Sequence, residues 1–198
     1  MRLLLLRHAP TPDTGKRLSG RQPGLHITSE GARHAERAGA ALTGYPVAAV
    51  YTSPVLRCRE TARLAAGAWG LKPMPLRGFT EVDYGEWTGR TLGSLRRTRL
   101  WSQLHAAPSR ARFPDGESIP EVQARAVAAA ERLTARHPED TVLVVSHADV
   151  IKLVLAHYLA MPLDSYQRLV VGPTSLSVVD LPGEAVPRVP VINCMAGA

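Results

Sequence analysis

Residues 3–8 read LLLLRH and residues 142–148 read VLVVSHA, and these two stretches decide the expected fold. Each is an apolar run of strand length that leads into a histidine. A run that is apolar at every position is typical of a strand buried on both faces of a parallel sheet. Residues 141–145 are the clearest strand of the chain, and a helix is expected to follow over residues 148–160.

Strands and helices are expected to alternate along the rest of the chain. Further strands are expected over residues 47–52, 74–76, 175–181 and 186–192. Helices are expected over residues 28–43, 54–66, 92–104 and 119–136, the last starting from a capping box of Ser118 and Glu121. This order predicts an α/β fold, a three-layer sandwich in which a mostly parallel central sheet carries helices on both faces. Ligands of such folds bind at the carboxyl ends of the strands.

Long segments rich in proline and glycine interrupt this pattern at residues 9–27, 78–90 and 108–116. Ordered loops of this length are usually functional. The first and second follow expected strands, so they are expected to lie near the carboxyl ends of the sheet. The loop at residues 105–117 is a candidate cover for the mouth of the ligand crevice, but the sequence does not decide its role.

The composition is typical of a globular protein, with 198 residues, 45% hydrophobic and 21% charged, and we expect one domain over residues 1–198. Two cysteines, Cys58 and Cys194, cannot build a disulfide framework, and no zinc-ligand spacing occurs. We therefore expect a cytoplasmic protein without a metal or another cofactor. The first apolar run is too short for a signal peptide, and polar residues interrupt the apolar stretch 141–163, so no membrane partner is expected.

Basic residues dominate the charge, with a net charge of +7 and 21 arginines among the 24 cations. A surface of this kind attracts anions, and the guanidinium group suits bidentate contacts to phosphate. Nucleic acids, acidic membranes and phosphorylated metabolites are all compatible with this charge. Biased nucleotide composition is an equally good explanation for the many arginines.

Candidate reactive side chains follow the expected strands. Arg7 and His8 follow the first strand, Arg57 lies just beyond the second, and His147 follows the strand at 141–145. A lone histidine at a strand end is more often structural than catalytic, but two in the same context suggest one shared site. Position alone does not select Arg57 over Arg59 and Arg63. Likewise, the loop after the third strand offers three carboxylates, and the sequence by itself does not choose among Glu81, Asp83 and Glu86.

Taken together, these residues resemble the histidine phosphatase superfamily, also called phosphoglycerate mutase-like. The resemblance covers nearly the whole chain in four blocks, at residues 3–14, 53–62, 81–89 and 144–152. Two short segments, SGRQPG at residues 19–24 and FPDGES at residues 113–118, resemble sequences found in small members of phosphatase or phosphomutase type. Two departures stand out: Ala9 replaces the usual glycine, and Thr14 replaces an asparagine frequent in mutases.

The resemblance implies a role for each block. His8, as a neutral imidazole, would attack phosphorus and form a phosphohistidine, and Glu81 would protonate the leaving oxygen. Arg7, Arg57 and a protonated His147 would bind the phosphoryl oxygens. Residues expected around the phosphate by the same resemblance are Thr14, Ser19, Gly20 and Arg21.

The expected function is hydrolysis of a small phosphorylated metabolite without a metal. A phosphoglycerate mutase is the alternative, although mutases generally carry an insertion for which only residues 89–141 are available here. A nucleic-acid-binding protein is a further alternative, but the chain shows no recognisable nucleic-acid motif, so no such partner is expected. An inactive member that binds phosphorylated partners would not need the full set of candidate residues. A homodimer is a hypothesis that the sequence does not test.

Overall fold

A computed structural model describes residues 1–183 and 185–195 of the chain. Within this part, six strands form one sheet with the order β3-β2-β4-β1-β5-β6. The strands are β1 (Arg2–Arg7), β2 (Val47–Thr52), β3 (Met74–Pro75), β4 (Thr141–Ser146), β5 (Ser175–Asp180) and β6 (Arg188–Met195). Strands β1, β2, β3 and β4 pair in parallel, while β5 runs antiparallel to both β1 and β6. The expected mostly parallel sheet is confirmed.

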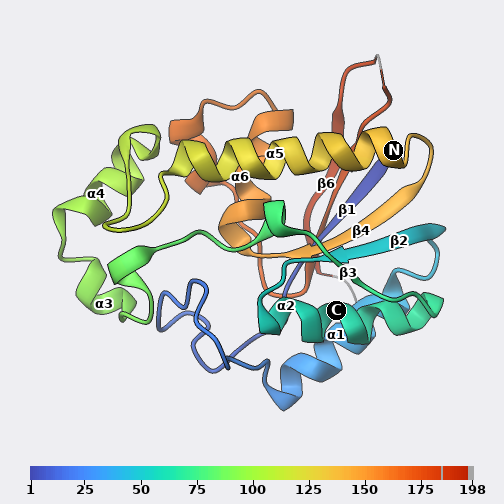
Figure 1. Ribbon diagram of the computed structural model, residues 1–198, viewed down its shortest axis with the longest axis horizontal. Coiled ribbons are helices and arrows are strands. Elements are labelled where there is room, and N and C mark those ends of the chain that lie inside the picture. Colours follow the sequence, from blue (N-terminus) through green and yellow to red (C-terminus); the bar gives the residue numbers. More distant parts are fainter. Residues whose placement is uncertain (184, 196–198) are drawn as a thin grey trace.

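Helices cover both faces of this sheet, as Figure 1 shows: α5 and α6 lie on one face, and α1 and α2 lie on the other. The α-helices are α1 (Ser29–Ala41), α2 (Leu56–Ala66), α3 (Leu92–Leu95), α4 (Arg99–Ala106), α5 (Ile119–Arg136) and α6 (Ala148–Tyr158). Short 3-10 helices are η1 (Gly67–Trp69), η2 (Arg77–Phe79), η3 (Gly85–Trp87), η4 (Pro108–Arg110) and η5 (Leu163–Arg168). The predicted three-layer arrangement is therefore present.

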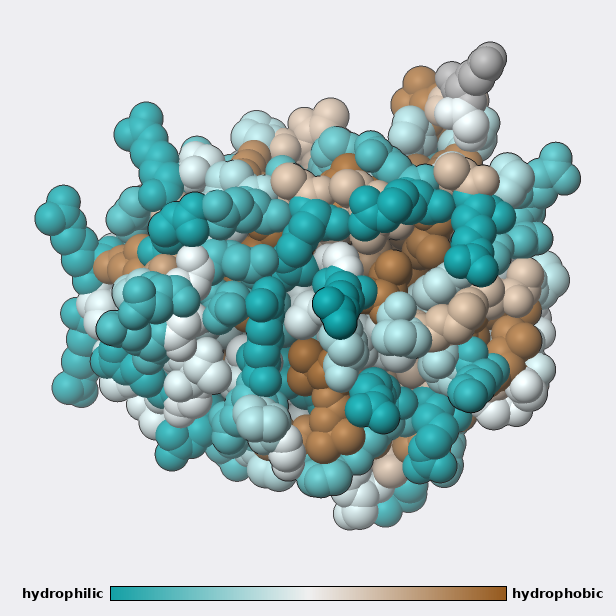
Figure 2. Space-filling model, viewed as in Figure 1, coloured by the Kyte–Doolittle hydropathy of each residue, from teal (hydrophilic) through white to brown (hydrophobic). Residues whose placement is uncertain are grey.

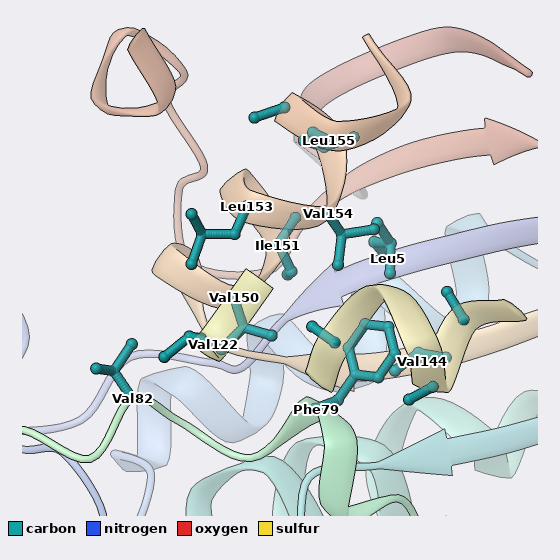
Figure 3. Close-up of a cluster of buried hydrophobic side chains, with 14 of the residues drawn as sticks. Leu5, Phe79, Val82, Val122, Val144, Val150, Ile151, Leu153, Val154 and Leu155 are labelled. Atoms are coloured by element: carbon teal, nitrogen blue, oxygen red, sulfur yellow. The ribbon is translucent and has the colours of Figure 1, made fainter. Parts of the chain in front are cut away.

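The central strands are apolar at every position because both of their faces are covered. In β1, Leu3 and Leu5 pack into the cluster under α5 and α6, whereas Leu4 and Leu6 pack into the cluster over α1 and α2. All four side chains are fully buried. Figure 3 shows the first cluster, in which side chains from β1, β4, α5 and α6 meet. Burial of each leucine side chain contributes about 1.5–3 kcal/mol to the stability of the sheet.

The predicted helix over residues 92–104 is wrong as a single element. The structure has two helices there, α3 and α4, with a break at residues 96–98. Thr98 has an extended backbone, and its hydroxyl accepts a hydrogen bond from the backbone N–H of Trp101. Threonine is one of the residues favoured at a helix N-cap, so a new helix starts at Arg99.

Other boundaries differ by a few residues from the predicted ones. The helix expected from residue 54 begins at Leu56, because Val55 has an extended backbone. The last strand, expected over 186–192, is displaced to 188–195 because its pairing with β5 extends from Arg188 to Met195. The capping box of Ser118 and Glu121 at the start of α5 is confirmed.

Hydrophilic residues cover most of the molecular face drawn in Figure 2, and hydrophobic residues form separate smaller areas on it. In the part of the chain that the structure describes, no helix combines the length and the apolar character needed to cross a bilayer.

The capping box allows a direct test of helix stability. In α5, the hydroxyl of Ser118 accepts from the N–H of Glu121, and the Glu121 carboxylate accepts from the N–H of Ser118. Ser118→Ala should lower the free energy of unfolding in urea by about 1 kcal/mol, because one helix N–H loses its acceptor. Ser102→Ala, at an exposed position inside α4, should change it by less than about 0.5 kcal/mol. Equal effects of the two substitutions would contradict the capping role.

Candidate active site

The carboxyl ends of β1 and β4 bring two histidines together. Arg7 is the register partner of Ser146, so His8 and His147 follow neighbouring strands at the same level of the sheet. The N–H of His8 donates to the carbonyl of Ser146 at 2.9 Å, and the two imidazole centroids are 5.3 Å apart. The two histidines that follow strands therefore do lie in one place.

The tautomer of His8 is determined by its backbone contact. Nδ1 lies 2.8 Å from the carbonyl oxygen of Ala9, an atom that can only accept, so Nδ1 carries the proton. Burial and the neighbouring charges of Arg57 and Arg7 lower the pKa of His8 well below its usual range, so the ring is neutral. Its Nε2 therefore carries a lone pair. In the structure that lone pair accepts a hydrogen bond from Nε of Arg57 at 3.1 Å.

Arg57 lies at the centre of the site. It extends from the first turn of α2 and is almost completely buried, while Arg59 is exposed. Its Nη2 donates to the carbonyl of Gly20 at 2.8 Å and to Nδ1 of His147 at 3.0 Å. Its Nη1 is buried and has no hydrogen-bond partner among the described residues. This leaves one strong donor of a permanently charged group free to bind an anion.

Glu81 is the carboxylate of its segment that reaches the site. Its Oε2 lies 3.5 Å from Nη2 of Arg57 and 3.4 Å from Nδ1 of His147. Burial raises the pKa of the Glu81 carboxyl to about 7, although the Arg57 charge and the N–H of Val82 favour the ionised form. A carboxyl with this pKa can both give and take a proton near neutral pH. The other two carboxylates in this loop lie elsewhere: Asp83 binds Arg21, and Glu86 is exposed.

His147 does not meet the expectation drawn from the sequence. Its ring is fully buried behind Arg57 and Glu81 and is not part of the cavity wall. Because the Arg57 guanidinium can only donate, Nδ1 of His147 accepts, and Nε2 donates to the hydroxyl of Ser53 at 2.8 Å. Burial and nearby positive charge lower the pKa of His147 well below its usual range. The ring in this structure is thus a neutral support for Arg57 and not a cation that faces the phosphate.

Arg7 supplies the second free donor of the site. Its Nη1 donates to the carbonyl of Val171 at 2.7 Å, and its Nε is buried without a partner among the described residues. Arg7 lies beside His8, at the end of β1, and both residues line one cavity.

A cavity of about 400 Å³ opens in front of these groups. Its walls include most of the residues expected there, namely Arg7, His8, Thr14, Ser19, Gly20, Arg57 and Glu81. Gly20 has a φ of +52°, and a Cβ at this position would stand 3.0 Å from the hydroxyl of Thr88. Glycine therefore lets the backbone of residue 20 turn its carbonyl toward Arg57. Ala9 has no such strain, because its φ is not positive.

The structure corrects the role expected for Arg21. Its guanidinium points away from the cavity and donates to the carbonyl of Glu81 at 2.9 Å and to the Glu117 carboxylate at 2.9 Å. Arg125 of α5 donates to the same two acceptors at 3.1 and 2.9 Å. The backbone N–H of Asp83 completes the set by donating to Glu117. We call Arg21, Glu117 and Arg125 the Glu81 clamp, because they fix the segment that carries the carboxyl.

Sequence reasoning missed several residues of the site. It assigned no role to Glu117 or Arg125, which are distant in sequence from Glu81. Asp149 lies in the first turn of α6, lines the cavity and accepts a hydrogen bond from the Tyr84 hydroxyl at 3.0 Å. The only sequence signal for it was its position two residues after His147.

Comparisons with known proteins show the family of the chain. A sequence model of the histidine phosphatase superfamily (branch 1) matches residues 3–194. The chain belongs to this superfamily. It is similar to an acid phosphatase of Mycobacterium tuberculosis, with 30% identity over 89% of this chain and 85% of the relative. It is also similar to a probable phosphoglycerate mutase, GpmB, of Yersinia enterocolitica, with 28% identity over 91% of this chain and 85% of the relative.

Other relatives in the superfamily are longer. The bifunctional protein Rv2228c of Mycobacterium tuberculosis is 32% identical over 97% of this chain, but the match covers only 53% of that protein. This chain therefore spans about half the length of that relative. Among solved structures, Bacillus stearothermophilus YhfR superimposes with a TM-score of 0.89 at 28% identity, covering 98% of this chain and 96% of that one.

The raised pKa of Glu81 predicts a distinctive titration in this superfamily member. Carboxyl-carbon NMR should show one glutamate with a midpoint near 7, because burial disfavours the ionised carboxylate. Glu81→Gln should remove that transition, and Glu86→Gln, which changes an exposed glutamate of the same segment, should preserve it. A Glu81 carboxyl that titrates near 4.5, the ordinary value for this group, would contradict the burial effect.

Proposed function

We propose that the protein is a phosphomonoesterase that hydrolyses a small phosphorylated metabolite through a phosphohistidine on Nε2 of His8. The supporting observation is the pair of buried guanidinium donors, Nε of Arg7 and Nη1 of Arg57, that lack a partner among the described residues. A buried donor without an acceptor is costly, and a phosphate oxygen would satisfy both donors. Both flank a neutral histidine whose second nitrogen carries a lone pair.

Substrate binding prepares the nucleophile. The dianionic phosphoryl group accepts from Arg7 and Arg57, and Nε of Arg57 exchanges its bond to Nε2 of His8 for one to a phosphoryl oxygen. The released lone pair of Nε2 then points at phosphorus, while Nδ1 stays held by the carbonyl of Ala9. Because the imidazole is already neutral, no base is needed before attack.

Each of the two chemical steps moves one proton and breaks one bond to phosphorus. Nε2 of His8 forms a bond to phosphorus as the ester oxygen leaves, and the protonated Glu81 carboxyl gives its proton to that oxygen. The Glu81 carboxylate then takes a proton from a water molecule, whose oxygen attacks phosphorus. The bond between nitrogen and phosphorus breaks, inorganic phosphate leaves, and both His8 and Glu81 return to their starting states.

The donor set supports a reaction without a metal ion. The negative charge of the equatorial oxygens is met by two guanidinium groups, which are rigid, permanently charged and already desolvated. His147 contributes by holding Nη2 of Arg57 and by its contact with Glu81. It is therefore a positioning residue in the unliganded site.

Hydrolysis is preferred over phosphoglycerate mutation in this proposal. Between residues 89 and 141 the chain has only α3, α4, η4 and α5. Mutases of this superfamily generally carry an insertion in that interval, by the resemblance stated above. The similarity to a probable mutase keeps phosphoryl return to the substrate as the second candidate. Release of inorganic phosphate as opposed to an isomerised ester separates the two.

The nucleophile can be tested directly. His8→Ala should abolish phosphate release and the acid-labile, base-stable phosphoenzyme formed from a radiolabelled substrate. His26→Ala, which changes an exposed histidine, should leave both intact. Circular dichroism should show that both variants fold. Undiminished turnover in His8→Ala would rule out the mechanism.

The proton donor can be tested through the leaving group. In the wild-type protein, kcat/KM for an alkyl phosphate should fall above pH about 7 as Glu81 loses its proton. Glu81→Gln should lower kcat for that substrate by about 10²–10⁴-fold. With p-nitrophenyl phosphate the phenolate leaves without a proton, so Glu81→Gln should show a burst of nitrophenolate followed by slow turnover. If Glu81→Gln lowered kcat by the same factor for both substrates, with no burst of nitrophenolate, Glu81 would not be the proton donor.

A further inference from the structure

A second cavity lies beside the first and is lined mainly by aromatic rings. It measures about 200 Å³, and five of its wall residues are Tyr84, Trp87, Trp101, Phe113 and Tyr166. The whole sequence has only ten tryptophan, tyrosine and phenylalanine residues, so half of them gather around this space. We call it the aromatic cavity.

The aromatic cavity shares a wall with the cavity that holds His8 and the two arginines. Leu18, Tyr84, Asp149 and Gln167 line both spaces. An ester whose phosphoryl group lies against His8 would thus have its alcohol portion at this shared wall. The aromatic cavity is a partly open space that adjoins the cavity of His8 along this wall.

Most walls of the aromatic cavity are held rigidly. Phe113 meets Tyr84 and Trp87 in edge-to-face contacts, with ring centroids 4.9 and 5.6 Å apart. Trp87, Phe113 and Tyr166 are all buried. Trp101 of α4 is only partly buried and stacks against the exposed His105 at 4.9 Å, so these two rings form the accessible rim.

The polar groups of the shared wall already satisfy one another. Asp149 accepts from the Tyr84 hydroxyl at 3.0 Å and lies 3.4 Å from the ammonium of Lys152. Gln167 accepts from Lys152 at 3.2 Å and donates to the Tyr166 hydroxyl at 2.7 Å. Lys152, which lines the first cavity beside this wall, is held by Asp149 and Gln167, and the Asp149 carboxylate would repel a second anionic group on the substrate.

The size of the aromatic cavity fits one ring. An apolar protein cavity of about 150 Å³ is enough to hold a benzene molecule. Edge-to-face and stacked contacts with the surrounding rings would add to the free energy of binding. An uncharged aromatic ring therefore matches this space in both volume and chemistry.

We propose that the aromatic cavity binds the leaving group, and that the substrate is a phosphomonoester of an alcohol bearing an uncharged aromatic ring. This inference rests on the proposed phosphatase function. It disfavours substrates whose alcohol carries a carboxylate, such as phosphoglycerates.

The experiment compares phosphate esters whose leaving groups have similar basicity. Differences in kcat/KM then reflect contacts between the leaving group and the protein, and not the intrinsic reactivity of the ester. Benzyl phosphate and ethyl phosphate both release an alkoxide, and 4-carboxybenzyl phosphate adds one negative charge to the ring. We expect kcat/KM for benzyl phosphate to exceed that for each of the other two by about tenfold, which corresponds to about 1.4 kcal/mol. Equal values for benzyl and ethyl phosphate would overturn the proposal.

Variants of Trp101, at the rim of the aromatic cavity, test whether this cavity causes the preference for benzyl phosphate. Trp101→Ala should lower kcat/KM for benzyl phosphate by about tenfold and leave that for ethyl phosphate within about twofold, and Trp101→Phe should restore most of the preference. Trp69→Ala, which removes a partly buried tryptophan of η1 outside both cavities, is the matched control and should not alter the preference. If Trp101→Ala lowered kcat/KM for benzyl phosphate and for ethyl phosphate by the same factor, the Trp101 ring would have only a structural role and the proposal would be wrong.

A binding measurement separates this inference from the proposed function. In the His8→Ala variant, calorimetry should show that benzylphosphonate binds about tenfold more tightly than ethylphosphonate, without any catalysis. If the wild-type protein hydrolyses no phosphomonoester but the His8→Ala variant still prefers benzylphosphonate, the proposed phosphatase function is wrong. The aromatic cavity is then still a binding site for an aromatic ring. If the wild-type protein hydrolyses phosphomonoesters but benzylphosphonate binds no more tightly than ethylphosphonate, only the proposed role of the aromatic cavity is wrong.

Discussion

The buried guanidinium of Arg57 is the interaction on which the rest of the site depends. A charge in a nearly dry interior is tolerated only where hydrogen bonds and neighbouring groups offset its desolvation. Here the carbonyl of Gly20, the two histidines and the Glu81 carboxylate surround it. Four distant segments of the chain thus converge on one side chain. One of its nitrogens, Nη1, is a buried donor without a partner among the described residues.

The same positive charge organises the proton chemistry. Together with burial, which has the larger effect, it lowers the pKa of His8 and of His147, so that Nε2 of His8 and Nδ1 of His147 both accept hydrogen bonds from Arg57. Glu81 is subject to two opposing effects: burial favours its neutral form, and Arg57 favours its ionised form. The outcome near neutral pH suits a group that must give a proton and then recover it. In the Glu81 clamp, Arg21 and Arg125 donate to the backbone carbonyl of Glu81, and Glu117 accepts from the backbone N–H of Asp83 in the same segment.

The fold was largely predictable from sequence because the central strands are apolar at every position. The β1 and β4 runs predicted a doubly covered sheet, and the histidines after them predicted where the site lies. Prediction failed where tertiary contacts decide: the break at Thr98, which separates α3 from α4, depends on a cap and not on hydrophobic periodicity. Arg57 and Glu81 could be selected from neighbouring arginines and carboxylates only through the family resemblance, since local spacing was equally compatible with the others.

By itself the sequence determined the order of strands and helices, the buried sheet and the residue types available for phosphoryl chemistry. Local patterns carry this information because burial on both faces demands apolar residues at every position. Only the tertiary structure decided which charges face the cavity. It placed Arg21 on the backbone of Glu81 and His147 behind Arg57, although both were expected at the phosphate. Direction and desolvation of a side chain depend on contacts between segments far apart in the chain, and a linear sequence does not display those contacts.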